Sequence, residues 1–518
     1  MSQVIQAYAI SAPGFYGLNT QDSSLDLASG FALTANNAVI DQYGRIGARK
    51  GWTPNHSTLA ALGTANVKAI GELITVDGTS YTICAGNNKL FKLVGSTLTE
   101  LTYGGGGTAP TISSSNWQMA SLGGGLYLFQ EGYDPLEFNP TTSTTQYRRI
   151  SEMGSYSGTV QKGNAVISAY GRLWNVGSVT DKVTIQWCNT KQPYNWSTGL
   201  AGTLDTTTVW PKGGDTVVGL GAHNGFLFVF GKNNILVYQG AMDPSASTFS
   251  LQDVITGIGC ISRDSIAYTG TDIVFLSQTG VRSLQRTIQE KSAPFRELSK
   301  NVRNDLLTYI QAETLSDIKA VYSPIDAFYL LSLPYAKQVY CFDTKAQLQD
   351  GSARVTTWDS IEPTSFCAKQ DGTLLLGKAG YVATYTGYTD NTANYQFQYF
   401  TNHTDFGAPS VTSILKSLLV TVIGGNGQAL TFKWGYDFTG NFYSQNVIIP
   451  ANNIAYYGES EYNYGADYSS GQALTVLKAY PTGSGKVVQT GYEAYINGAP
   501  LSIQKLEIHA KNGKILSS

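Results

Sequence analysis

Charged side chains are scarce in this chain. Lys, Arg, Asp and Glu make up 14% of its 518 residues, with 36 acidic residues against 34 basic ones. A nucleic-acid reader needs a clustered basic face that displaces counterions from phosphates, and this composition argues against one. The polar surface must therefore come mainly from Ser, Thr, Asn, Gln and Tyr, which suits a subunit that is largely covered by copies of itself or by partners.

Cysteines, amino-terminal basic residues and long apolar runs are also rare. The five cysteines are scattered, and an odd count without paired spacing indicates reduced, buried thiols made in a cytoplasm. The first basic residue is Arg45, so the amino terminus lacks the positive region of a secretion signal. The most apolar run, 418–423, is shorter than the roughly 20 residues that cross a bilayer. We expect a protein that is soluble when made and has no membrane span.

The short motifs that mark enzymes are missing. Near Lys486, a Gly-Ser-Gly-Lys sequence resembles a phosphate loop, but Tyr480 replaces the upstream Gly and Val487 replaces the hydroxyl residue. Tyr156 occupies the nucleophile position of a Gly-x-x-x-Gly turn, and the four histidines form no His-x-x-x-His pair. We therefore expect no enzyme, no catalytic or metal-binding residues and no cofactor.

What the chain does contain is a repeated unit of two apolar strands joined by a polar turn. Successive units begin roughly 45 to 55 residues apart, which is the spacing of blades in a β-propeller. We predict an all-β fold with a propeller of six to seven blades over residues 56–400; with six, the remaining strand pair would serve closure. The seven units begin at Tyr81, Leu126, Leu173, Phe226, Ile273, Phe328 and Thr373.

Three segments depart from the repeat. Residues 1–55 have too little apolar periodicity to fold alone, and we expect an extended N-terminal arm that packs on something else. Apolar residues at helical spacing predict one inserted helix from Arg296 through Thr314, which packs on the ring or docks another subunit. Alternating strands over 401–518 predict a small C-terminal β-sandwich, whose Tyr-rich tract from Tyr456 to Tyr468 is either a protein contact or an ordinary loop.

An ordered set of short motifs lies between Ala12 and Trp52. It reads Gly-Leu-Asn from Gly17, then Ala-Asn-Asn-Ala-Val-Ile-Asp from Ala35, then Gly-Arg-Ile-Gly-Ala-Arg from Gly44. This order resembles the amino-terminal region of the tail hub or nozzle proteins of short-tailed bacteriophages, the tail tubular and packaged-DNA-stabilisation type. The specific likeness is confined to this segment, while the propeller layout is compatible with that family but general.

The resemblance implies a virion protein of the tail, assembled in the host cytoplasm. Six copies would form a homohexameric ring below the portal and adaptor proteins, retain packaged DNA and conduct it during ejection. Tail fibre or needle proteins would be further partners, with only transient, non-specific contact to viral DNA. The resemblance also implies subunit or adaptor contacts for six residues, which could instead staple the arm onto its own propeller. These six are Asn19, Asn37, Asp41, Gly44, Arg45 and Arg49.

Two other functions compete with this one. A propeller lectin or receptor-binding module of a phage tail would use Tyr and Trp side chains to stack on sugars, but the units diverge too much to repeat one site per blade. A propeller hydrolase would need an acid and a nucleophile that face the axis, and the sequence pairs no two carboxylates there. For a conduit, the low charge predicts a neutral to acidic channel lining, since exposed basic residues would hold phosphates.

Overall fold

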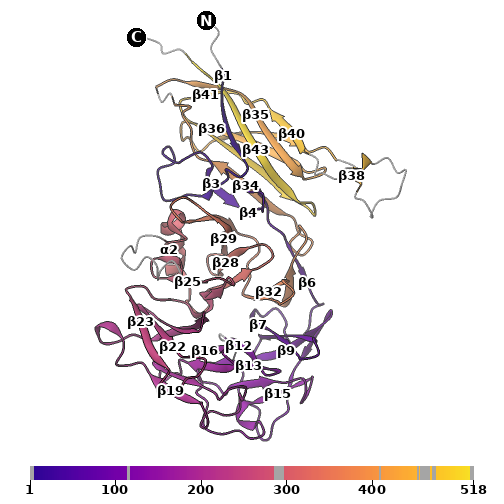
Figure 1. The fold of residues 1–518 in the computed structure, drawn as a ribbon. Helices are drawn as coiled ribbons and strands as arrows, with labels where there is room; N and C mark the ends of the chain where they lie inside the picture. Colours follow the sequence, from indigo (N-terminus) through magenta and orange to yellow (C-terminus); the bar gives the residue numbers. More distant parts are fainter. Residues whose placement is uncertain are drawn as a thin grey trace.

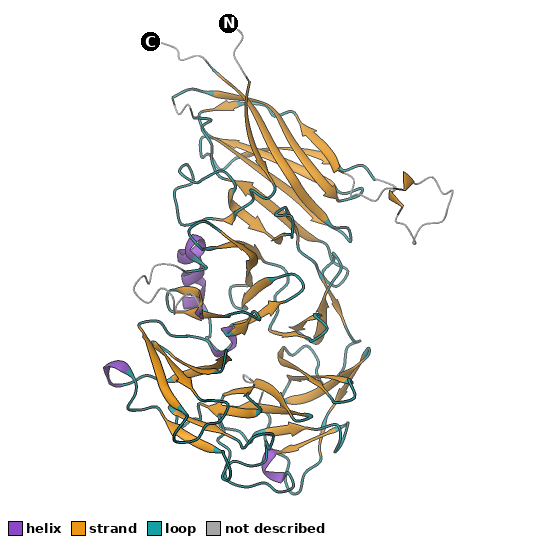
Figure 2. Ribbon diagram, in the orientation of Figure 1, coloured by secondary structure: helices purple, strands orange, loops and turns teal. Residues whose placement is uncertain are grey.

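The computed structural model describes residues 5–113, 117–284, 297–407, 410–451, 454–455, 467–468 and 474–513. The molecule is elongated, with a ring of small sheets at one end and a β-sandwich, from which both chain ends emerge, at the other (Figure 1). Strands dominate throughout and helices are few and short (Figure 2). Among the described residues, no helix is long and apolar enough to cross a membrane.

The ring is a β-propeller of seven sheets within the described residues. Each innermost strand lies beside the innermost strand of the next sheet, directly or through the short helix η3 (Arg263–Ser265), and the seventh returns to the first. The first four blades are β7 to β10 (Val67–Ile74, Ser80–Gly86, Lys89–Val94, Thr97–Glu100), β12 to β15 (Trp117–Leu122, Gly125–Gln130, Leu136–Phe138, Gln146–Arg149) with β11 (Thr102–Tyr103), β16 to β19 (Ala165–Ala169, Arg172–Val176, Thr184–Trp187, Gly202–Asp205) and β20 to β23 (Val217–His223, Phe226–Gly231, Asn234–Gln239, Ser250–Thr256).

The last three blades differ in how they are completed. The fifth has three strands, the sixth continues into the sandwich, and the seventh takes its outermost strand from the N-terminal arm. They are β24 to β26 (Ala267–Tyr268, Ile273–Ser277, Gly280–Ser283), β27 to β30 (Lys319–Ser323, Phe328–Leu333, Gln338–Gln347, Ala353–Trp358) and β31 to β33 (Ser365–Ala368, Leu374–Lys378, Tyr381–Tyr385) with β6 (Trp52–Pro54).

The seven predicted strand pairs are confirmed as neighbouring strands of the seven blades. In six blades they are the two middle strands, and in the three-stranded fifth blade they are β25 and the edge strand β26. Middle strands are buried on both faces, as β13 is along its whole length, so their sequences read as continuous apolar runs. Outer strands such as β19 are half exposed and give a weaker signal. The ring is closed by β6 of the arm, which pairs with β33, and not by one of the seven predicted strand pairs. The number of blades is therefore seven.

The sandwich prediction is confirmed, and the arm supplies part of it. One sheet orders β4 (Ala38–Ile40), β5 (Ile46–Ala48), β43 (Leu501–Asn512), β35 (Ser413–Gly424) and β40 (Leu474–Ala479), with β1 (Ile5–Ser11) on β43 and β41 (Ser484–Gly485) on β35. The other runs from β30 through β2 (Gly17–Leu18), β3 (Phe31–Asn36), β34 (Tyr395–Thr401), β42 (Val488–Ile496) and β36 (Ala429–Tyr436) to β37 (Phe442–Ile448). A separate pair joins β38 (Ile454–Ala455) to β39 (Asp467–Tyr468).

The arm is therefore shared between the two folded parts. Strands β1 to β5 belong to the sandwich sheets and β6 to the propeller. The sequence segments 1–55, 56–400 and 401–518 remain useful names, but their strands interleave, because β1 pairs with β43 from the opposite end of the chain. The arm, expected to pack on something else, thus packs on the sandwich and on the seventh blade.

The inserted helix is confirmed between the fifth and sixth blades. A 3-10 turn, η4 (Lys300–Val302), leads into α2 (Arg303–Ala312), whose Leu306 and Ile310 are buried in the core that joins ring and sandwich. Packing on the ring is thus one role of this helix; docking of another subunit stays a prediction. Two further 3-10 turns are η1 (Ile150–Glu152) and η2 (Pro211–Gly213). Residue 296 and most of the Tyr-rich tract, 456–466, lie outside the described residues.

Candidate functional site

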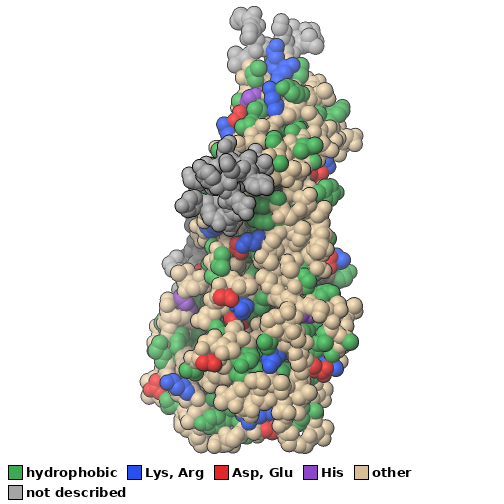
Figure 3. All heavy atoms as spheres, turned by 90° about the vertical axis from the view of Figure 1, so that its right-hand side faces the viewer, with side chains coloured by type: hydrophobic (Ala, Val, Ile, Leu, Met, Phe, Trp, Pro, Cys, Tyr) green, Lys and Arg blue, Asp and Glu red, His purple; other side chains and the backbone are tan. Residues whose placement is uncertain are grey.

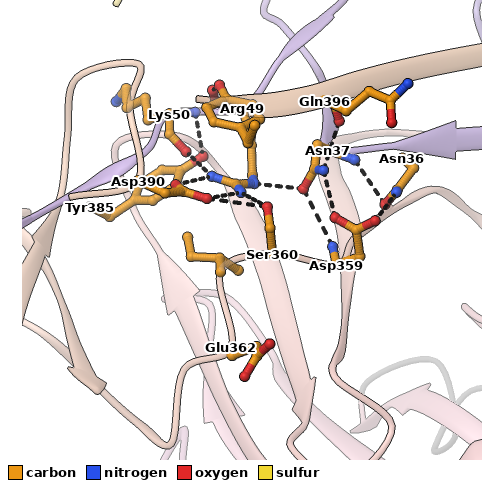
Figure 4. A network of polar contacts seen from close by, with 12 residues as sticks. Asn36, Asn37, Arg49, Lys50, Asp359, Ser360, Glu362, Tyr385, Asp390 and Gln396 are labelled. Atoms are coloured by element: carbon orange, nitrogen blue, oxygen red, sulfur yellow. Dashed lines mark hydrogen bonds and ion pairs between the residues drawn. The ribbon is translucent and has the colours of Figure 1, made fainter. Parts of the chain in front are cut away.

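Arg49 is the centre of a polar network where the arm, the propeller and the sandwich meet (Figure 4). Its side chain has no exposed surface. The two terminal nitrogens donate to the Asp390 carboxylate at 2.9 and 2.7 Å in a bidentate pair. The remaining N–H groups reach Asn37 Oδ1, the Lys50 carbonyl and Ser360 Oγ at 2.8 to 2.9 Å, so all five donors are used.

Asn37 extends this network across the junction. Its amide nitrogen donates to Asp359 Oδ1 at 2.7 Å and to the Gln396 carbonyl at 2.8 Å, and its oxygen accepts from Arg49. The residue has φ +50°, a conformation that Asn tolerates better than most side chains. Asn37 and Arg49 therefore tie the arm to two segments, around Asp359 and Asp390, that each lie more than 300 residues away from it in sequence.

Asp41, Gly44 and Arg45 form the turn between β4 and β5. Asp41 Oδ1 accepts from the backbone nitrogens of Tyr43 and Arg45, while Arg45 Nε donates to Gln504 Oε1 on β43 at 2.7 Å. Gly44 has φ +73°, and a Cβ there would lie 2.6 Å from Pro13 Cβ, so glycine is required. Asp41 and Arg45 remain partly exposed, with side-chain exposures of 29% and 16%. They line a cleft of about 390 Å³ between arm, propeller loop and sandwich.

Asn19 lies apart from both groups. Its Oδ1 accepts from the backbone nitrogens of Gln21 and Asp22, and its Nδ2 donates to the Asp22 carboxylate at 2.8 Å. It is buried and shapes the turn after β2. Asn37 and Arg49 thus hold the arm against other segments of its own chain, while Asn19 shapes a turn within the arm. Contacts of Asp41, Gly44 and Arg45 with another subunit stay a prediction.

A buried lysine borders the strand that closes the ring. Lys378 Nζ donates to the Ile361 carbonyl and lies 4.8 Å from the centre of the Trp52 ring on β6. Burial lowers the pKa of Lys378 from 10.5 to about 8, against the opposing charges of Asp390 and Glu362. The amine therefore makes the closing blade sensitive to pH.

A second buried cluster lies among the inner strands of the propeller. Arg263 in η3 donates to the Trp117 carbonyl at 3.1 Å and to the Asn164 carbonyl, which belong to the second and third blades. Asp264 is bonded by both Arg263 and Lys319. Burial alone would raise the pKa of Asp264, but these two cations outweigh it and lower the pKa to about 2. The carboxylate is therefore ionised at neutral pH and pairs with both cations among the inner strands.

No signal in the sequence identifies the partners of Arg49. Asp390, Asp359 and Ser360 stand in ordinary polar loops, and only the fold brings Asp390 across 341 residues to Arg49. The buried cluster around Asp264 was not predicted for the same reason, because Asp264 and Lys319 lie 55 positions apart in sequence. The residue types predict polar turns at these positions. Which side chains pair with each other is decided by the tertiary structure.

No protein-family model and no curated protein matches this chain. Among solved structures, the extracellular domain described as a hybrid two-component system of B. thetaiotaomicron is 11% identical, with 67% of this chain and 41% of that chain covered and a TM-score of 0.41. The WD40 domain of Neurospora crassa Pan2 is 9% identical over 65% of this chain and 96% of that one, with a TM-score of 0.38.

A third similar structure is the WD40 β-propeller domain of Doa1, which is 10% identical over 64% of this chain and 96% of that chain, with a TM-score of 0.38. This chain thus covers less than half of the extracellular-domain chain and nearly all of each WD40 domain. At these identities and TM-scores the similarities support no statement about function. The propeller assignment rests on the strand pairing described above.

Proposed function

We propose that the protein is a structural subunit of a short bacteriophage tail, a hub or nozzle in which six copies form a ring that retains packaged DNA and conducts it during ejection. One observation carries the proposal. The segment that resembles tail hub proteins, residues 12–52, is the segment that joins propeller to sandwich and closes the ring. Asn37 and Arg49 of its motifs bond across this junction. The resemblance therefore concerns the architecture as well as the sequence.

The chemistry of the junction supports that link. Arg49 uses all five donors, Asn37 adopts a positive φ, and Gly44 leaves no room for a side chain. A chance likeness in sequence would have no reason to fall on residues with such strict structural demands. The pattern therefore favours a protein built on the same propeller and sandwich plan as the tail hubs.

We propose further that the subunit is not an enzyme. A propeller glycosidase needs a carboxylic acid that can give up and regain a proton near neutral pH. Asp264, a carboxylate in η3 beside the inner strands, has its pKa lowered to about 2 by Arg263 and Lys319 and is engaged by both. It is suited to holding blades together and unsuited to proton transfer.

The proposal places the protein in the tail of the virion, after assembly in the host cytoplasm, beside the portal and adaptor and the fibre or needle proteins. The test is electron microscopy of virions labelled with an antibody to this chain. Label at the tail axis, below the portal vertex, is expected. Label on fibres alone would favour the receptor-binding alternative, and virions without label would end the tail proposal.

A further inference from the structure

The outer face of the seven-stranded sandwich sheet is rich in basic side chains. Along β43 the residues alternate, so that Leu506, Ile508 and Ala510 are buried in the sandwich while their neighbours point outward. Register places Lys478 of β40 opposite Leu419, and Lys511 opposite Ile414 of β35. The outward basic residues on this face are Lys416, Lys478, Lys505, His509 and Lys511.

Three of these lysines have no carboxylate partner among the described residues. In the propeller most basic side chains are paired, as Lys89 is with Glu100 and Lys300 with Asp350. Here Lys416 and Lys511 form no described ion pair, and Lys478 contacts only the Tyr480 ring, 4.8 Å from its centre. One sheet of a chain with more acidic than basic residues thus carries three lysines that pair with no carboxylate of the described residues. In Figure 3 basic side chains gather near the end where the termini lie.

One acidic residue lies among them. Glu507 contacts Lys505 Nζ at 2.5 Å and His509 Nε2 at 3.3 Å. The hydrogen bond from Lys505 lowers the pKa of Glu507, so this carboxylate is ionised and already neutralised by its neighbours. Among the residues that the structure describes, the charges of Lys416 and Lys511 therefore have no carboxylate counterpart.

Exposed apolar side chains adjoin the lysines on the same face. Leu474 and Val476 precede Lys478 at alternate positions of β40 and are 59% and 61% exposed. At the other end, Ile5 of β1 lies opposite Lys511 and is 56% exposed, and Ile414 is 39% exposed. Apolar area combined with charges at its margin is the composition of a protein–protein interface.

We propose that this face binds an acidic protein surface of a different chain, one that sets carboxylates against Lys416, Lys478 and Lys511 and apolar side chains against Leu474 and Val476. A nucleic acid fits less well, because Glu507 would repel phosphates and the branched apolar side chains would contact no base. A two-fold pairing of this face with the same face of a second copy fits less well, because it would set lysine against lysine.

The test compares two charge-reversal variants of the full-length protein. K416E/K511E changes the face, and K191E/K232E changes two exposed propeller lysines that likewise form no described ion pair. Binding is measured by fluorescence anisotropy to a peptide that alternates Glu and Val, to a peptide that alternates Lys and Val, and to duplex DNA. We expect the acidic peptide to bind, K416E/K511E to weaken it about tenfold, and K191E/K232E to leave it unchanged.

Added salt should weaken the peptide complex, since the ion pairs lie at the surface. The proposal is overturned if both variants lose the same affinity or if the two peptides bind alike. Selective loss of DNA binding in K416E/K511E would assign the face to phosphates, and selective loss of self-association in sedimentation would assign it to a second copy. Should K416E/K511E unfold, K416Q/K511Q removes the charge without repulsion and must give the same ranking.

Discussion

Arg49 shows how one buried side chain can hold a multi-part protein together. The guanidinium satisfies a carboxylate, an amide, a hydroxyl and a carbonyl from three segments, and stacks 4.1 Å from the centre of the Tyr395 ring. A buried ion pair adds little net stability, but loss of one partner leaves an uncompensated charge. The network therefore determines the position of the arm on the propeller and sandwich, and it contributes little net free energy of folding.

Replacing Arg49 by Met should lower the free energy of unfolding by about 3 to 5 kcal/mol, because Asp390 would remain buried without its cation. Urea denaturation measures this loss. The control is K89M, which breaks the exposed Lys89–Glu100 pair and should cost less than about 1 kcal/mol. Equal effects of R49M and K89M would contradict the role assigned to the network.

Lys378 predicts a pH dependence of known sign. Its pKa is about 8 in the folded chain and returns to 10.5 on unfolding, so the unfolded chain binds more protons between these values. The contribution of Lys378 to stability is therefore absent below pH 8 and grows as pH rises toward 10.5.

Urea denaturation of wild type and K378M across this interval isolates that contribution, because other titrating groups act equally on both. The wild type should gain stability relative to K378M by up to about 3 kcal/mol between pH 8 and pH 10.5. A difference that stays constant with pH would show that the amine is not desolvated when folded.

At the scale of elements, the sequence identified the middle strands of the blades and, apart from β26 of the three-stranded fifth blade, not the strands at their edges. Strands such as β21 and β28 are apolar along their length because both faces are covered. The arm strands gave no such signal: β4 to β6 are three residues each, and β5 and β6 pair with β43 and β33, which lie far away in sequence. Local periodicity cannot report a pairing whose two halves are at opposite ends of the chain.

The candidate site shows the same division. The turn of Asp41, Gly44 and Arg45 could be read locally, because a carboxylate that accepts from nearby backbone N–H groups and a glycine at positive φ are properties of a few neighbouring residues. The Arg49 network could not, because Asp390 and Asp359 become its neighbours only through ring closure.

Ring closure itself can be tested at Gly51, where the arm crosses the chain after β33. A Cβ at this position would lie 1.9 Å from the Thr389 carbonyl oxygen, and backbone cannot move aside as a flexible side chain can. We expect G51A to lower the free energy of unfolding by about 3 kcal/mol. The matched control is G106A, which meets nothing within 4 Å. Near-equal stability of the two variants would mean that the arm does not lie tightly on this segment.

At the scale of the whole molecule, the propeller and sandwich should unfold as one unit. The sheet that contains the sixth blade runs without a break into the sandwich, and one core cluster includes Tyr340 of the ring and Phe432 of the sandwich. Trp434 is the single tryptophan beyond residue 400. The thermal midpoint reported by Trp434, obtained by comparing wild type with W434F, should coincide with the midpoint of the propeller tryptophans. Two separated midpoints would show independent domains.

The central claim is that this chain builds a ring of six. Native mass spectrometry of the purified full-length protein, alone and with a portal and adaptor complex, tests it most directly. The predicted result is a species of six times the 55.7 kDa chain mass, formed alone or on the portal complex. A monomer that stays monomeric in both conditions, and that is instead retained on glycan columns, would contradict the claim and favour a receptor-binding module.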